Sequence, residues 1–267
     1  MIEASEQVVK ERQISILDQV KKYCGDHKIN YFLTGGTCIG AIRHNGFIPW
    51  DDDIDISMLR KDYEDFIEHF NSTKSKYQVY TCENESSYPF PFAKIVDLTT
   101  IYVEANDELK MEMGINIDLF PIDRLPDQKY LSSIIQNSIK FLRNVIYVKA
   151  IDVKTNRGTK KNMILNVTKV LGKAASSNSI SKIINSIARN TGDATSKKGG
   201  ILVWGYGKRE IVEMDVFRDT VILDFEGRKH TVPVGYHDWL TSIYGNYMQL
   251  PPVEKQVTHH QYKAFIK

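Results

Sequence analysis

The sequence predicts an α/β (α+β) fold in which a mixed sheet is flanked by helices and interrupted by a basic helical segment. Three observations predict this class. Helical and strand patterns alternate over residues 1–128, a lysine- and arginine-rich helical pattern fills residues 129–198, and strand patterns return over residues 199–267. We therefore expect one body made of the first and third ranges, with the middle range as a helical insertion.

The first range contains three helical patterns and six β-prone runs. Helices are expected at residues 9–24, 37–44 and 63–70, and apolar residues recur every three or four positions in the first and the last of these. Strands are expected at residues 29–33, 53–56, 77–81, 92–98, 100–104 and 114–119, because these runs are β-prone or alternate apolar with polar residues. The order of these elements predicts a mixed α/β sheet.

The remainder changes from helices back to strands. In the basic segment, apolar spacing predicts helices at residues 131–146, 163–171 and 180–188. Strands are expected next at residues 201–204, 220–225 and 228–232, the last two as a hairpin around Glu226-Gly227. A final helix is expected at residues 236–244.

The net charge of +2 results from two parts of opposite sign. Residues 129–198 contain 14 lysines and arginines against two acids, which gives +12 and leaves −10 for the rest. The total therefore excludes a uniformly basic nucleic-acid binder, while the basic segment would suit an anionic glycan or the inner membrane leaflet. A solvated helical bundle is the alternative for that segment.

The chain shows no membrane or secretion signal that we can identify. No window approaches the roughly 18–20 apolar residues of a membrane span, and Met1–Lys10 lacks the apolar core of a signal peptide. Cys24, Cys38 and Cys82 are odd in number and lack metal-ligand spacing. They predict reduced, mostly buried thiols in a cytoplasmic protein.

An acidic run at Asp51-Asp52-Asp53-Ile54-Asp55 carries the strongest chemical signal. If residues 53–56 form a strand, Asp53 and Asp55 project from one face about 7 Å apart, and they repel unless a cation lies between them. Mg²⁺ prefers a few carboxylates, with water and phosphate oxygens as its other ligands. The pair therefore indicates metal-assisted phosphoryl or nucleotidyl transfer; a solvated acidic turn is the alternative.

Two further features support the phosphate interpretation. Gly35 and Gly36 lie between a strand and a helix, where backbone N–H groups can approach phosphate oxygens and Thr37 can add a hydroxyl donor. Asp118, on an alternating run, is the expected third carboxylate, and Asp123 is its competitor.

The run from Thr34 to Ile56, TGGTCIGAIRHNGFIPWDDDIDI, closely resembles the signature of the LicD family in the polymerase-β-like nucleotidyltransferase superfamily, which also includes fukutin-related proteins. The resemblance extends to Asn116–Asp123 and to Tyr244–Pro252 with His259-His260. It implies a nucleotidyltransferase-like fold and a cytoplasmic enzyme that moves phosphocholine from CDP-choline onto a cell-surface glycan or teichoic acid precursor. It also implies Mg²⁺ or Mn²⁺ at Asp53, Asp55 and Asp118.

The resemblance leaves several residues without a defined role. Fifteen residues separate Thr37 from Asp53, more than in many members of the superfamily. We expect the charged residues nearby to contact substrate, together with the strand residue Lys94: Arg43, His44, Asp51 and Asp52. An exposed helix-end arginine and an edge-strand lysine are the alternatives for Arg43 and Lys94.

Aromatic residues supply weaker candidates. Trp50, Tyr88, Phe90 and Phe92 could box a quaternary ammonium by cation–π contact, although such residues are more often core. The runs Trp204–Gly207 and Tyr236–Trp239 could shape the acceptor side, and His259-His260 is a further weak candidate or a tail.

Two other functions stay open at this point. A nucleotidyltransferase that forms a nucleotide-activated alcohol or adenylylates a small molecule could use the same carboxylates, and it would release pyrophosphate where a phosphotransferase releases CMP. A non-catalytic module could bind anionic lipid or nucleic acid through its basic helices. The residues do not identify the alcohol or the acceptor.

Overall fold

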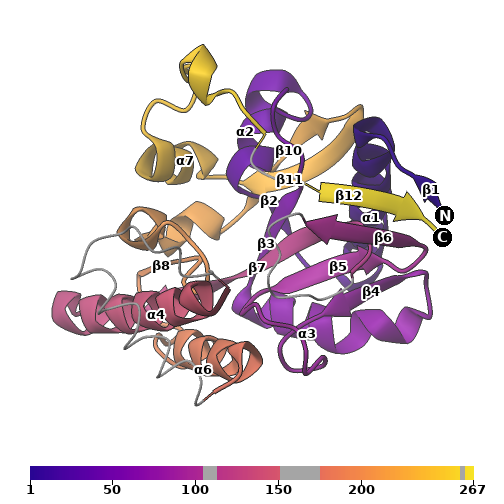
Figure 1. The fold of residues 1–267 in the computed structure, drawn as a ribbon. Helices are drawn as coiled ribbons and strands as arrows, with labels where there is room; N and C mark the ends of the chain where they lie inside the picture. The colour runs from indigo at the N-terminus through magenta and orange to yellow at the C-terminus, as the bar shows by residue number, and fades with distance from the viewer. Residues whose placement is uncertain (105–112, 151–174, 259–261) are drawn as a thin grey trace.

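The computed structural model describes residues 1–104, 113–150, 175–258 and 262–267. The predicted helix at residues 163–171 and the pair His259-His260 lie outside the described residues. The predicted α/β class is confirmed: helices surround a mixed central sheet (Figure 1). Among the helices of the described ranges, none combines the length and the apolar character that crossing a bilayer requires.

The central sheet has the strand order β2-β3-β7-β5-β4. Its strands are β2 (Phe32–Leu33), β3 (Asp55–Leu59), β7 (Asn116–Leu125), β5 (Ala93–Asp97) and β4 (Tyr77–Tyr80). The strands β3 and β7 are parallel, and the other neighbours pair antiparallel. The far end of β7 pairs with β8 (Lys198–Gly200), which in turn pairs with β9 (Val212–Glu213).

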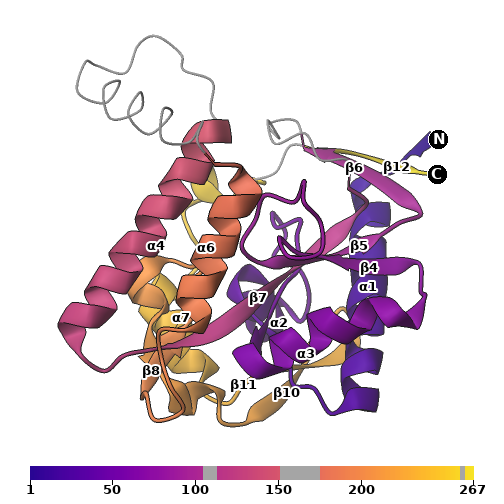
Figure 2. The same cartoon turned by 90° about the horizontal axis from the view of Figure 1, so that it is seen from below.

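The described ranges contain six α-helices. They are α1 (Glu6–His27), α2 (Gly35–His44), α3 (Arg60–His69), α4 (Lys129–Ala150), α6 (Ser177–Arg189) and α7 (Tyr236–Tyr244). Contacts join α1 to β5 and β7, and α3 to β3 and β7, while α4 packs on α6. Figure 2 shows α4 and α6 side by side at one side of the molecule.

Two small β-units complete the fold. The strands β1 (Ile2–Glu3), β12 (Tyr262–Ile266) and β6 (Thr100–Glu104) form a sheet that brings the two chain ends together (Figure 1). The predicted hairpin consists of β10 (Thr220–Phe225) and β11 (Arg228–Pro233). Short 3₁₀ helices cover residues 70–73, 207–210, 214–217 and 253–255.

Side-chain alternation along β7 divides the core into two parts. Ile117 and Leu119 join the core formed with α1 and α3, whereas Phe120 and Ile122 join a second core formed with α4, α6 and α7. Because side chains two apart share a face, Asp118 lies on the face of Phe120 and Ile122. The catalytic candidates therefore face the half of the protein that contains the basic helices.

Two strand predictions are wrong in position. The strand expected at residues 53–56 begins at Asp55, so Asp53 lies in the segment before it. Residues 201–204 form a turn, and pairing occurs earlier, at β8. A Cβ on Gly199 would stand 2.3 Å from the backbone carbonyl oxygen of Asp123. One on Gly200 would stand 2.2 Å from the backbone carbonyl oxygen of Glu210. These two glycines allow the close approach of backbones, while the apolar residues after them are buried in the second core.

A buried ion pair joins three elements at the centre of the molecule. Arg60 of α3 donates two hydrogen bonds of 2.6 Å to the Asp123 carboxylate of β7 and a third, of 2.9 Å, to Asn185 Oδ1 of α6. Asp123 is only 2% exposed. The Asp123 carboxylate therefore holds α3 and β7 together. This structural task sets it apart from Asp118, with which it competed as the third metal-binding carboxylate.

We expect Asp123→Asn to lower the free energy of unfolding by about 3 kcal/mol, because it leaves the Arg60 charge buried without its counterion. Urea unfolding measures this change. The matched control is Asp224→Asn, which removes an exposed carboxylate paired with Lys229 in the hairpin and should shift the midpoint little. Equal midpoints for the two variants would contradict the structural role of Asp123.

Candidate active site

A cavity of about 900 Å³ lies between the central sheet and the half that contains α4 and α7. One wall is formed by the start of α2 and by the acidic segment that leads into β3. The opposite wall includes Arg143 and Tyr147 of α4 and the loop at residues 204–206. Residues 246–255, after α7, contribute to a third side. The cavity therefore draws on all three ranges that we distinguished in the sequence.

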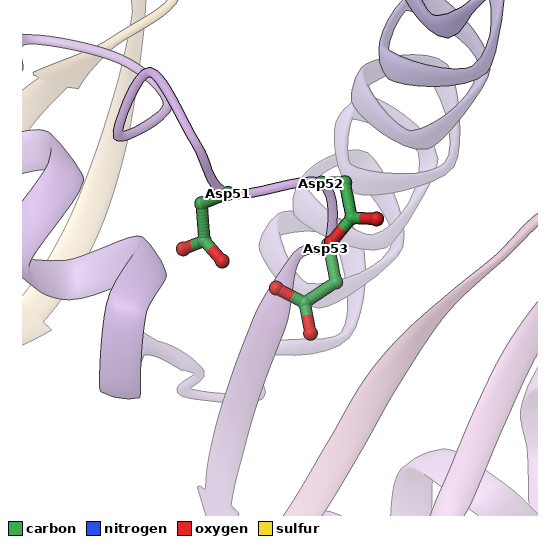
Figure 3. A group of neighbouring side chains, drawn as sticks. All are labelled: Asp51, Asp52 and Asp53. Atoms are coloured by element: carbon green, nitrogen blue, oxygen red, sulfur yellow. The ribbon is translucent and has the colours of Figure 1, made fainter. Parts of the chain in front are cut away.

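Three of the predicted acids line this cavity: Asp51, Asp53 and Asp55. One carboxylate oxygen from each of Asp51, Asp52 and Asp53 lies within 4.8 Å of the others. Figure 3 shows these three side chains on the extended segment that leads into β3. Asp52 is 2% exposed, and its backbone oxygen accepts a hydrogen bond from Gln13 of α1.

The parallel pairing of β3 and β7 brings Asp118 to this cluster. Asp118 stands directly opposite Asp55 in the register of the two strands, and its N–H donates to the Ile54 oxygen over 2.9 Å. Lys94 stands opposite Asp118 on the other side, and its Nζ lies 2.5 Å from Asp118 Oδ1 and 3.0 Å from Asn116 Oδ1. Because β5 lies between two strands, Lys94 is not an edge-strand residue.

The carboxylates repel one another strongly. Burial raises the pKa of Asp55 well above its ordinary value, and the charges of Asp53, Asp118 and Asp51 raise it further, while Lys94 opposes them. A divalent cation would relieve this repulsion, since hard cations take carboxylate oxygens as ligands. The residues therefore fit the Mg²⁺ or Mn²⁺ that the family resemblance implied.

Two glycines leave room for these acids. The helix α2 begins at Gly35, which has a φ of +55°, and a Cβ there would lie 3.2 Å from Asp55 Oδ2. A Cβ on Gly36 would lie 2.4 Å from Asp51 Oδ2. The Thr37 hydroxyl accepts the Asp55 N–H over 2.9 Å and is buried, so it orients β3 behind the cavity wall.

Arg43 and His44, two further residues predicted to contact substrate, lie at the end of α2. Arg43 lines the cavity, but its Nη1 donates to the Tyr247 oxygen over 2.7 Å and its Nε donates to His44 Nε2 over 2.9 Å. Burial and the Arg43 charge lower the pKa of His44. These contacts show that Arg43 fastens the segment after α7 to α2, so the exposed helix-end arginine is ruled out.

The predicted aromatic box does not form. Tyr88 is fully buried and Phe92 is 3% exposed. Phe90 and Phe92 pack on Trp204 with ring centroids 5.8 and 5.5 Å away, whereas Trp50 lies near His44, 6.4 Å between ring centroids. Tyr88, Phe90 and Phe92 contact one another in the segment before β5, whereas Trp50 lies in the segment before β3, so the four rings do not enclose one site.

The structure adds two cavity residues that we did not predict for the site, Arg143 and Glu210. Arg143 donates to the Gly205 oxygen over 2.8 Å, and its guanidinium stands 5.0 Å from the Trp204 ring. Glu210 is 2% exposed. Its carboxylate accepts the Trp239 indole N–H over 3.0 Å and the Tyr206 N–H over 3.2 Å. The basic composition of residues 129–198 hinted at a role for Arg143. Glu210 is a single acid in a loop, and no sequence pattern marks it.

Glu210 also explains the run at residues 236–239. Trp239 is fully buried and donates to Glu210, so it supports the cavity wall from behind rather than facing an acceptor. Desolvation raises the pKa of Glu210 to about 7, against the opposing effects of its two hydrogen bonds and of Arg143. A carboxyl group that titrates near neutrality therefore lies beside the acidic cluster.

Comparison with known proteins agrees with the geometry. The family model described as "LicD/FKTN/FKRP, nucleotidyltransferase domain" matches residues 28–139, which include every predicted carboxylate. The chain is 33% identical over 261 residues to the lipopolysaccharide cholinephosphotransferase LicD of Haemophilus influenzae, with 95% of each chain covered. It is also 33% identical over 82 residues to an uncharacterized protein of Rickettsia prowazekii, covering 30% of this chain and 29% of that protein.

The raised pKa of Glu210 predicts a pH-dependent stability. Below about pH 7 the folded protein keeps the Glu210 proton, whereas the unfolded chain releases it near 4.5. The folded state then binds more protons, so the free energy of unfolding falls as pH rises from about 4.5 to 7. Over this pH range we expect the free energy of unfolding of Glu210→Gln to decrease by about 3 kcal/mol less than that of the wild type.

Urea unfolding of wild type and Glu210→Gln at several pH values measures the effect. Glu213→Gln, which alters an exposed carboxylate on the neighbouring β9, is the control and should follow the wild-type curve. Parallel curves for wild type and Glu210→Gln would contradict the assignment.

Proposed function

Because this chain belongs to the LicD family and is therefore a phosphotransferase, we propose that it transfers phosphocholine from CDP-choline to a cell-surface glycan precursor. The observation that supports the proposal most is the acidic cluster at the cavity: Asp53 and Asp55 line a cavity of about 900 Å³, and Asp118 stands opposite Asp55 in the sheet. The relative that aligns over 95% of both chains is a lipopolysaccharide cholinephosphotransferase. A teichoic acid precursor is the alternative acceptor.

We assign the binding of Mg²⁺ or Mn²⁺ to Asp53, Asp55 and Asp118. Electrostatics support this assignment, because Asp55 is buried among like charges that Lys94 opposes. When bound, such an ion neutralises charge that develops on the diphosphate as CMP leaves. Asp51, on the same wall, is available to bind the ion or to orient its water ligands.

The protein's own groups then have separate tasks. The first N–H groups of α2, at Gly35 and Gly36, are placed to hold donor phosphate oxygens. Asp118 is placed to complete the ion's shell or to accept the proton of the attacking hydroxyl. Lys94 orients Asp118 through a charge-assisted hydrogen bond, and Thr37 orients Asp55 through its backbone.

The basic half of the molecule is assigned to the acceptor. Arg143 of α4 and Lys255 line the cavity, and their positive charges would attract a negatively charged glycan. Contact of the same helices with the inner membrane leaflet would bring a lipid-linked acceptor to this wall.

The alternative reaction, nucleotidyl transfer, differs in its product. Incubation with a panel of CDP-alcohols and Mg²⁺ should release CMP, fastest from CDP-choline, whereas incubation with CTP and phosphocholine should release no pyrophosphate. Pyrophosphate from CTP without CMP from any CDP-alcohol would overturn the phosphotransferase proposal. The enzymatic family argues against the non-catalytic lipid- or nucleic-acid-binding module.

We expect Asp53→Asn, Asp55→Asn and Asp118→Asn each to lower CMP release at least 100-fold and to weaken Mn²⁺ binding, because each removes a ligand charge. Titration followed by electron paramagnetic resonance measures the second effect. Asp224→Asn, an exposed hairpin carboxylate, should change neither. Near-normal activity in Asp53→Asn and Asp55→Asn would refute the site.

Gly36→Ala should lower CMP release at least tenfold, because its methyl carbon would lie 2.4 Å from Asp51 Oδ2 and displace that carboxylate. The matched control is Gly25→Ala in α1, where an added Cβ meets no atom within 4 Å. Full activity of Gly36→Ala would show that neither the Asp51 position nor the close approach at Gly36 matters for turnover.

A further inference from the structure

The aromatic residues of the cavity differ in how accessible they are to a ligand. Trp204 already contacts a cation, since the Arg143 guanidinium stands 5.0 Å from its ring, and Tyr147 packs on it at 4.9 Å between centroids. Tyr247 is 6% exposed. In contrast, Tyr206 is 60% exposed and Tyr244 is 36% exposed. Tyr147 is also 43% exposed, but it lies on α4 against Trp204. Tyr244 reaches the acidic cluster, because its hydroxyl and Asp55 Oδ2 both approach Gly35, and Tyr206 packs on Tyr244.

Tyr206 and Tyr244 form a corner. Their ring centroids are 5.3 Å apart with planes at 68°, and the Tyr244 hydroxyl donates to the Tyr206 hydroxyl over 3.3 Å. The two rings meet edge to face at a steep angle, and aromatic cages for quaternary ammonium groups likewise combine steeply inclined rings. We call this pair of side chains the tyrosine corner.

The tyrosine corner is held rigidly. Glu210 accepts the Tyr206 N–H and the Trp239 indole N–H, and so ties the loop at residues 204–207 to α7. Ser242 of α7 donates to the Arg209 oxygen over 2.7 Å, which makes a second tie between the same two elements. Because both tyrosines are fixed by these ties, a ligand would meet a preformed surface.

The corner also adjoins the carboxylates. A Cβ built on Gly35 would lie 3.6 Å from the Tyr244 hydroxyl and 3.2 Å from Asp55 Oδ2, so both groups meet at this glycine. Burial raises the pKa of Tyr206, and the negative charges of Asp55, Glu210 and Asp53 raise it further. A cation placed at the corner would therefore experience aromatic faces and a negative potential together.

Choline has the chemistry that this surface can recognise. Its ammonium has no N–H and cannot form hydrogen bonds, so aromatic faces and nearby negative charge are its means of recognition. Only two carbons separate that nitrogen from the phosphate ester oxygen, so the ammonium site must adjoin the phosphate site. We propose that Tyr206 and Tyr244 bind the quaternary ammonium of the donor and so select choline among alcohols, an inference that rests on the proposed function.

The experiment compares CDP-choline with CDP-glycerol, which lacks the cation. For Tyr206→Leu and Tyr244→Leu, the ratio of kcat/KM for CDP-choline over CDP-glycerol should fall about tenfold. For Tyr206→Phe and Tyr244→Phe, which keep the ring, the ratio should stay within about twofold of wild type. Tyr130→Leu, at an 80% exposed position on α4, is the control for loss of a tyrosine elsewhere.

Three results would overturn the inference. If the ratio of kcat/KM values is unchanged in both leucine variants, the tyrosine corner does not discriminate between the alcohols. Equal losses in the phenylalanine and leucine variants would show that the hydroxyls act instead of the rings. Equal losses with both donors would show a general structural role.

Calorimetric titration with phosphocholine and Mg²⁺ separates this inference from the proposed function. We expect phosphocholine to bind wild type and to bind Tyr206→Leu about tenfold more weakly, which supports the tyrosine corner. If wild type binds phosphocholine in this way but releases no CMP, only the proposed reaction is refuted. Absence of phosphocholine binding to wild type, or equal binding to the variant, would overturn the corner itself.

Discussion

The parallel register of β3 and β7 is the constraint on which the site depends. It sets Asp55 directly opposite Asp118, so two like charges share the centre of the sheet, with Asp53 and Asp51 close by. Such a cluster is unfavourable without a cation. The neighbouring parts compensate for it: Lys94 pairs with Asp118, and Thr37 receives the Asp55 N–H. In our proposal a metal ion with its phosphate ligands completes this balance.

The same cluster explains the glycines and the shape of the cavity. A side chain at Gly36 would collide with the Asp51 carboxylate, and one at Gly35 would be a tight fit against Asp55. The facing wall consists of pieces distant in sequence, fastened by Arg143 to the loop at residues 204–207 and by Glu210 to α7. Arg60, paired with Asp123 of β7, also donates to Asn185 of α6 and so joins the central sheet to the helical half.

Much of this was predictable from local patterns. Helical spacing located the helices, and two-residue alternation together with the glycine pair identified the acidic run, because these signals depend on near neighbours. The strand expected at residues 201–204 and the aromatic box failed for one reason. Apolar and aromatic residues are equally suited to a strand, a turn or a core, and their partners at Glu210, Trp204 and α4 lie far away in sequence.

The sequence alone indicated the family through the motif it resembles and the α/β class through the spacing of its apolar residues, and it singled out the acidic run as candidate ligands. Tertiary structure decided which acid joins them: Asp118 meets Asp55 across β7, whereas Asp123 is neutralised by Arg60. It also decided which aromatic rings stay accessible, and it placed the tyrosine corner beside Gly35. The reason is physical, because pairing register and burial depend on contacts between residues that no local pattern connects.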